Sequence, residues 1–132
     1  MNAYQQNVVE LIPNAVRSVS VDGTGVDVKD FNGVAHVILS TSAATAGTTP
    51  TLDVKLQESD ALGSGYTDIT GAAFTQVTDA ADSTQMISFQ VGEVKRYVRA
   101  VATIGGTVTP TFGFGVSMLA IRAAGRNASQ AV

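Results

Sequence analysis

The strongest constraint on this sequence is a period of two in the placement of its apolar side chains. In the segment TLDVKLQ, Leu52, Val54 and Leu56 take every second position, with polar side chains between them. Such a period puts all the apolar side chains on one face of an extended strand. The segment QMISFQV, residues 85–91, repeats the pattern. No long stretch shows the period of an α-helix, so the sequence predicts an all-β protein.

Two further segments predict strands with unusual faces. VAHVILS, residues 34–40, is apolar on both faces, which is typical of a strand covered on both sides. The two faces carry Ala35, Val37 and Leu39 on one side, and Val34, His36 and Ile38 on the other. From residue 108 to residue 120, large apolar side chains alternate with small ones that include Gly113 and Gly115. We expect this small face to let another stretch of backbone approach closely.

Turn residues between these strands set the expected fold. Gly, Asp, Asn and Ser cluster between the alternating segments, and the pair Asn32-Gly33 is a strong signal for a type I′ turn. Short strands at this spacing favour a single-domain antiparallel β-sandwich that resembles a jelly roll. We expect an extended N-terminal arm over residues 1–16, the β-sandwich domain over residues 17–121, and a short C-terminal tail over residues 122–132. The arm is expected because alternation is missing before Pro13.

The charge of the chain points to a partner. Charged residues make up 14% of the 132 residues, against roughly 25% in an ordinary soluble domain. A surface so poor in charge is expected to be covered in part by another protein. Residues 1–90 hold three basic and ten acidic side chains, a balance of −7, whereas residues 91–132 have a balance of +4. This asymmetry suits the association of like subunits, although chance variation within a small domain explains it equally well.

The positive charge is concentrated in the segment VGEVKRYVRAVATIGG, residues 91–106. The alternation there places Lys95 and Arg96 at the start of a strand and points Arg99 away from the core. These three residues are candidates for contacts with a neighbouring subunit. The alternative is that they are ordinary solvated residues at a strand end.

The sequence gives no support for catalysis or for a bound cofactor. There is no cysteine, which excludes thiolate metal sites, and His36 is the single histidine, which excludes multi-histidine metal clusters. Asp60 and Asp68 flank a Gly-rich loop, but their spacing matches no calcium-binding loop, and we expect them to stabilise turns. We therefore expect a protein that is not an enzyme, with no cofactor and no metal.

Nucleic acid, sugar and membrane partners are also disfavoured. The net charge of −3 argues against a nucleic-acid surface. The chain has no tryptophan on which a sugar ring would stack. Its longest apolar run, residues 112–121, is about half the ~20 residues of a membrane helix. No secretory signal is recognisable at the N-terminus, so we expect a soluble protein made in the cytosol.

Three segments in a fixed order resemble a known family. They are VDVKDFNGVAHVIL, LDVKLQESDALGSGYTDI and VGEVKRYVRAVATIGGTVTP, the last followed by an apolar strand. Together they cover roughly residues 21–121, and they are similar to small virion proteins of tailed bacteriophages, of the capsid decoration or cement type. None of the three segments is catalytic.

The resemblance implies a β-sandwich on the outside of the phage head that stabilises the capsid. It implies the major capsid protein as partner, a homo-oligomer that is often a trimer, and assembly on the capsid surface in the host cytoplasm. Lys95, Arg96 and Arg99 would then make intersubunit or capsid contacts. Two alternatives stay open: a receptor- or glycan-binding module displayed on the virion, and a tail or head–tail structural component.

Overall fold

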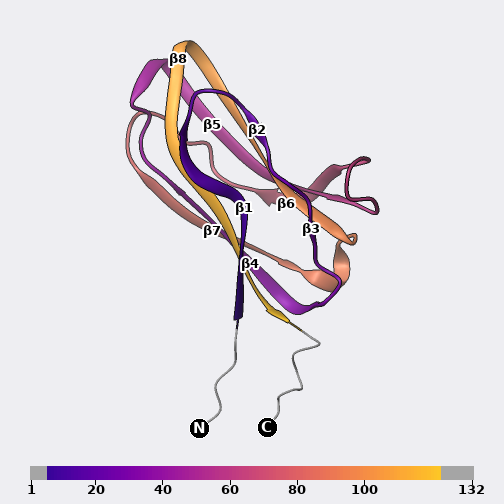
Figure 1. The fold of residues 1–132 in the computed structure, drawn as a ribbon. Helices are drawn as coiled ribbons and strands as arrows, with labels where there is room; N and C mark the ends of the chain where they lie inside the picture. The colour runs from indigo at the N-terminus through magenta and orange to yellow at the C-terminus, as the bar shows by residue number, and fades with distance from the viewer. Residues whose placement is uncertain (1–5, 123–132) are drawn as a thin grey trace, which may run out of the picture.

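The structure, a computed structural model, describes residues 6–122 and consists almost entirely of antiparallel strands (Figure 1). The elements are β1 (Gln6–Arg17), β2 (Val21–Asp22), β3 (Val26–Asp27), β4 (Phe31–Thr41), β5 (Ala46–Ser59), β6 (Thr67–Ala73), β7 (Ser83–Gln90), the 3₁₀ turn η1 (Val91–Glu93) and β8 (Tyr97–Arg122). This confirms the all-β antiparallel sandwich that the alternation predicts.

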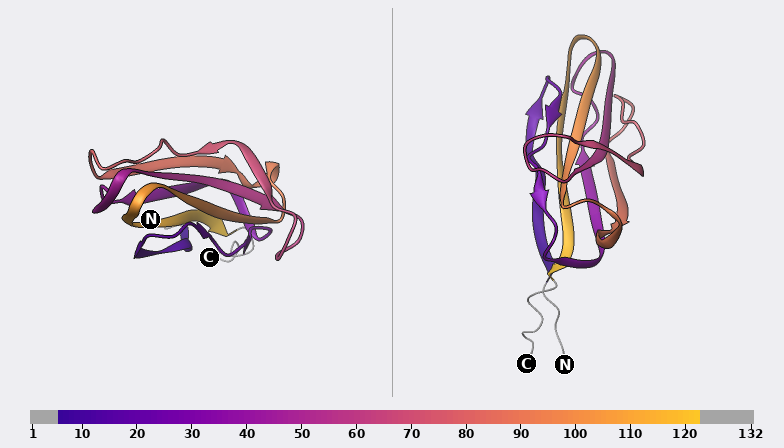
Figure 2. Two further views of the ribbon diagram at one scale, coloured as in Figure 1. Left: turned by 90° about the horizontal axis from the view of Figure 1, so that it is seen from above. Right: turned by 90° about the vertical axis from the view of Figure 1, so that its right-hand side faces the viewer.

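The strands form two layers that share β8. Sheet A contains β1, the second half of β8, β4 and β7, in that order. Sheet B contains β2 and β3, the first half of β8, β5 and β6. The two views in Figure 2 show the layers packed against each other in an elongated molecule, with the start of β1 and the end of β8 at the same end.

A sharp turn near the middle of β8 carries the chain from sheet B to sheet A. Gly106, Val108 and Thr109 have φ angles of 111°, 58° and 52°, and the chain reverses there at the top of Figure 1. Strand β5 follows the same turn, because its Ala46 pairs with Thr111 beyond the turn, and Thr51 pairs with Gly105 before it. The two expected strands on either side of Gly106 are therefore one continuous element.

The core lies between the two sheets and is supplied by the alternating positions. Sheet B contributes Leu52, Val54 and Leu56 from β5, each at most 2% exposed, and every second residue of β8 from Val98 to Ala102. Sheet A contributes the fully buried side chains Ala35, Val37, Leu39, Phe112, Phe114, Val116 and Met118. Burial of this apolar surface is the main driving force for the fold.

The N-terminal boundary differs from the expectation. From Gln6 onward the expected arm is strand β1, which pairs with β8 from Gln6↔Ile121 to Arg17↔Phe112. Leu11 and Ile12 are each 1% exposed and belong to the core. Residues 1–5 of the expected arm, and residues 123–132 of the expected tail, lie outside the described residues. Arg122, where the tail was expected to begin, is the last residue of β8.

Two details of β4 also differ from expectation. Asn32-Gly33 makes no hairpin: Gly33 has a φ of 75° and lies within β4, where the register with β8 shifts between Asn32 and His36. The face of β4 that carries His36 is not fully covered, because Val34 remains 39% exposed. Only the face with Ala35, Val37 and Leu39 is buried.

The small side chains of β8 do allow a close backbone approach, and the approaching segment is β1. A Cβ atom added to Gly115 would lie 3.0 Å from the Cα atom of Asn14. The bulged register of β1 between Ile12 and Ala15 places Asn14 there.

Candidate interaction surfaces

The expected cationic cluster forms at one end of sheet B, and each of its members has a partner within the chain. The Arg96 guanidinium donates two hydrogen bonds to Asp27 Oδ2, from Nε at 3.1 Å and from Nη2 at 2.9 Å. Asp27 also accepts a bond from the backbone N–H of Lys29 at 3.0 Å. The hydrogen bond from Arg96 is the main reason that the pKa of Asp27 is lowered, and the same bond raises the pKa of Arg96.

Arg99 is held by two contacts on the outer face of sheet B. Its Nε and Nη2 atoms donate to Gln57 Oε1 at 3.0 and 2.8 Å. Its guanidinium carbon lies 4.2 Å from the centre of the Tyr66 ring, a cation–π geometry. The Tyr66 hydroxyl in turn donates to the Leu62 carbonyl at 2.7 Å. Arg99 thus points away from the core, as the alternation predicts, and it is half-buried.

Lys95 is the least constrained of the three cations. Its Nζ atom lies 3.9 Å from Asp60 Oδ2, and its side chain is 44% exposed. Its backbone N–H donates to Glu58 Oε1 at 3.1 Å. The structure therefore brings Lys95, Arg96 and Arg99 to the same end of one sheet. The contacts that satisfy them are intramolecular.

The acidic candidates of the Gly-rich loop do not form a site together. Asp68 is bonded to Lys55 at 3.0 Å and to Gln57 at 2.9 Å, and the hydrogen bond from Gln57 is the main cause of its lowered pKa. Asp60 faces Lys95 instead. Among residues 6–122, no three His, Asp or Glu side chains gather where they would hold a metal ion. That part of the chain also contains no helix long and apolar enough to cross a membrane.

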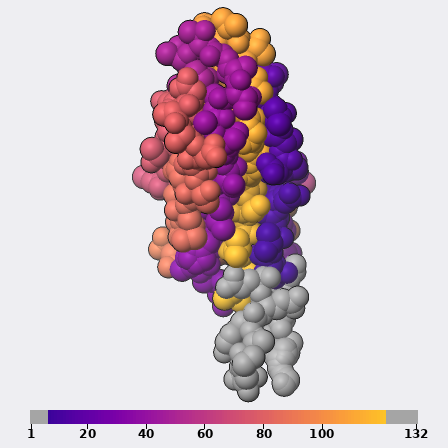
Figure 3. Space-filling view, turned by 90° about the vertical axis from the view of Figure 1, so that its left-hand side faces the viewer, coloured from indigo at the N-terminus to yellow at the C-terminus, as the bar shows by residue number. Residues whose placement is uncertain are grey.

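The outer face of sheet A differs in character from that of sheet B. Figure 3 looks onto it, with β7, β4, the end of β8 and β1 side by side from salmon to indigo. We call it the neutral face, and define it by Val8, Val34, His36, Ile38, Met86, Ser88, Ser117, Leu119 and Ile121. Leu119 lies between Val8 and His36 in the strand register, and Ile38 lies between Ser117 and Met86.

His36 occupies the centre of the neutral face. Its Nδ1 atom is 2.8 Å from Ser88 Oγ on the neighbouring strand β7. In the described part of the chain no hydrogen bond joins His36 to a carboxylate, so the pair lacks the third member of a catalytic triad.

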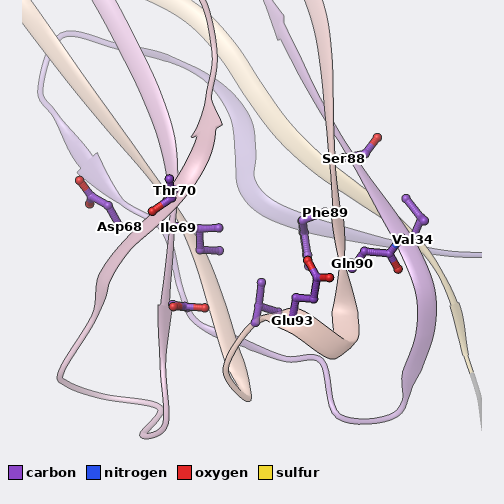
Figure 4. A pocket seen from close by; sticks show the side chains of 10 residues that line it. Val34, Asp68, Ile69, Thr70, Ser88, Phe89, Gln90 and Glu93 are labelled. Carbon is purple, nitrogen blue, oxygen red and sulfur yellow. The ribbon is translucent and has the colours of Figure 1, made fainter.

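An open groove of about 480 Å³ lies where the two sheets separate, between β6 and β7 (Figure 4). Ile69 points into the groove, whereas Asp68 points away from it. The lining residues are Val34, Glu58, Asp68, Ile69, Thr70, Ser88, Phe89, Gln90, Glu93 and Val94. They come from five separate elements and the loop before β8, so no local sequence pattern predicts the groove.

Comparisons with known proteins identify the fold and no closer relationship. No family model matches the chain, and no curated protein matches it in sequence. Among solved structures, the infectious bursal disease virus VP2 subviral particle aligns with 91% of this chain at 8% identity and a TM-score of 0.56. The Gx and Gt strains of the same virus each align with 93% of this chain, at 9% and 10% identity and TM-scores of 0.52 and 0.53.

The chain spans about a third of each of those viral chains, 33%, 33% and 34%. At such low identity the similarity concerns the fold alone. The protein therefore has a β-sandwich fold of the type found in that viral particle.

Proposed function

We propose that this chain is a non-enzymatic structural protein of a virion. The observation that carries the proposal is the alignment of 91% of the chain with the fold of a viral particle protein. The sequence resemblance to virion proteins of tailed bacteriophages supports the same function. The surface agrees with it, since the neutral face exposes apolar side chains in the way that protein-binding surfaces do.

In its specific form, the proposal is a decoration or cement protein on the outside of a phage capsid. Its partner would be the major capsid protein, and its own assembly a homo-oligomer, with a trimer expected from the resemblance. Lys95 and Arg96 would contribute capsid contacts, because their side chains stay 44% and 46% exposed despite their intramolecular partners. Such charges at the rim of an interface govern association rate and register more than affinity.

The test is a capsid-binding and capsid-stability assay. Capsids that lack the protein are mixed with the purified chain, sedimented, and heated while release of packaged DNA is followed. We expect co-sedimentation and a higher temperature of DNA release. Heat-denatured protein is the control for non-specific adsorption. Failure to bind, or binding without any effect on the release temperature, would contradict the cement function.

A receptor- or glycan-binding module is the second candidate, and the groove is the observation that favours it. Its volume of about 480 Å³ lies within the range of small-ligand sites. Phe89 is the aromatic residue that lines it, and the groove is otherwise bordered mainly by polar side chains. A glycan array with the purified protein separates the two candidates, because the cement function predicts no retained glycan.

A further inference from the structure

We propose that the neutral face is covered by a second copy of this chain in a homo-oligomer. The inference deepens the proposed function, which includes a homo-oligomer, by naming the surface through which like chains meet, and it requires no capsid. Three properties of the face support it: its apolar content, the lack of charge at its centre, and its size.

Exposed apolar side chains are concentrated on this face. Within residues 6–122, four of the eight large apolar side chains that remain exposed lie there: Val8 at 66%, Val34 at 39%, Met86 at 60% and Ile121 at 42%. They come from four different strands. In the strand register half-buried Ile38 pairs with Met86 and half-buried Leu119 pairs with Val8, whereas Val34 pairs with Gln90. Exposed apolar side chains gathered on one face of a sandwich in this way mark a contact with another protein.

The lack of charge at the centre of the face favours another copy of the same chain. Among the described residues, two acidic side chains lie at its margins: Glu10 on β1, paired with Ser117, and Glu93, which lines the groove together with Val34 and Ser88. Two copies can therefore meet face to face without repulsion between like charges at the centre. The outer face of sheet B is different, because it carries the Lys55–Asp68 and Arg96–Asp27 pairs and the Arg99–Gln57 bonds. Apolar cores of this kind are typical of contacts between identical subunits.

The size of the face is sufficient for a specific contact. The named positions span up to five residues of a strand, and the outward positions that flank them, Glu10 and Gln90 among them, extend the outer face of sheet A to about eight residues per strand. With strands about 4.8 Å apart and residues about 3.4 Å apart, four such strands have an area of roughly 500 Å². Two such faces in contact remove about 1,000 Å² from water, which reaches the lower bound for a specific interface.

The edge strand β7 supports a contact at the same place. Its sequence STQMISFQ, residues 83–90, contains no charge and no proline. Exposed edge strands in free proteins usually carry charged residues or proline, because an unprotected edge pairs with the strands of other chains. Strand β7 is the edge of sheet A at the neutral face, so a second copy on that face would lie beside this edge.

Two charge-insertion variants test the proposal. Met86→Lys and Val8→Lys each place a cation on an exposed position of the neutral face, on two different strands. Thr103→Lys is the matched control, because Thr103 is exposed on β8 in sheet B, opposite Asp53. Light scattering and sedimentation equilibrium over a range of concentrations give the mass of each purified protein. Circular dichroism confirms that each variant is folded.

We expect wild type and Thr103→Lys to form the same homo-oligomer. Met86→Lys and Val8→Lys should dissociate to folded monomers, with self-association weakened by roughly tenfold or more. If the variants dissociate the assembly, a dimer would bring two neutral faces together, whereas a trimer would bring the neutral face against a different surface of the next copy. Either assembly covers the face with a second copy, and the mass decides between them.

Two results would overturn the proposal. One is a wild-type monomer at every concentration. The other is a homo-oligomer that all three lysine variants preserve, which would move the contact to another surface. If the wild type is monomeric and Met86→Lys also loses capsid binding, the neutral face binds the capsid instead, and the proposed function survives while this inference does not.

Discussion

At the scale of single residues, the predicted cationic side chains contact partners that lie far away in the sequence. Arg96 bonds to Asp27, 69 residues earlier, and Arg99 bonds to Gln57, 42 residues earlier. Alternation predicts correctly that Arg99 points outward. It gives no information about the partners, because these depend on the register that pairs Val26 with Val98. The sequence therefore identifies the cationic residues of the candidate site but cannot assign their contacts.

The bond between Arg96 and Asp27 predicts a pH dependence of stability. Folding lowers the pKa of Asp27. The ionised carboxylate therefore stabilises the folded protein at any pH above the ordinary aspartate pKa of about 4. This stabilisation is lost as the pH falls through the lower pKa that Asp27 has in the folded protein. The effect should be small because both side chains are substantially exposed. Urea unfolding of wild type and Asp27→Asn should show a lower midpoint for the variant at about pH 7 and a shrinking difference below about pH 4. A difference that stays constant across this range would contradict the assignment.

The aromatic core predicts a large loss of stability on truncation. Phe112 is fully buried between the sheets, so Phe112→Ala should cost about 3–5 kcal/mol in the free energy of unfolding. Met86→Ala, on the exposed neutral face, should change the stability of the monomer by less than about 0.5 kcal/mol. Denaturant titration measures both. Similar values for the two variants would mean that the inward and outward faces of sheet A are assigned incorrectly.

At the scale of elements, alternation predicts the regular strands and fails where the backbone is irregular. Residues 51–57 of β5 and residues 85–90 of β7 follow the period of two, and the sequence predicts both as strands, although β5 begins earlier, at Ala46. In β1, Leu11 and Ile12 are adjacent and both buried, because the register shifts on either side of Ile12. The turn within β8 uses positive φ values at Val108 and Thr109, which are not residues that signal such a conformation. Bulges and strained turns depend on tertiary packing, so the local pattern does not show them.

Strand β1 predicts the result of an N-terminal deletion. Removing residues 1–12 eliminates the buried side chains of Leu11 and Ile12 and uncovers part of β8, so the truncated protein should fail to fold. Leu11→Ala alone should cost about 2–5 kcal/mol. Val8→Ala, at a position of β1 that is 66% exposed, is the matched control and should change monomer stability by less than about 0.5 kcal/mol. Thermal unfolding followed by circular dichroism measures all three. A truncated protein with unchanged stability would show instead that residues 1–12 form the independent arm that the sequence predicts.

At the scale of the whole molecule, the sandwich is closed by strands from the two ends of the chain. Gln6 pairs with Ile121, and β1 follows β8 along most of sheet A. Sheet A therefore cannot be completed until nearly the whole chain has come together, which is typical of slowly folding β-sandwiches. The same pairing places the start of β1 beside the end of β8, as Figure 2 shows.

This closure predicts that the chain tolerates circular permutation. Residues 123–132 and 1–5 would connect β8 to β1, and new ends would be opened between Ala80 and Ala81, which are exposed in the loop before β7. Exposed loops with few contacts are the sites where new termini are tolerated. We expect the permutant to keep the β-sheet circular dichroism spectrum and to unfold cooperatively. The control permutant opens the chain between Val37 and Ile38, inside β4, where both neighbouring strands pair. This control permutant should not fold, because a break there interrupts the centre of sheet A. Equal stability of the two permutants would contradict the strand order that places β4 between β8 and β7.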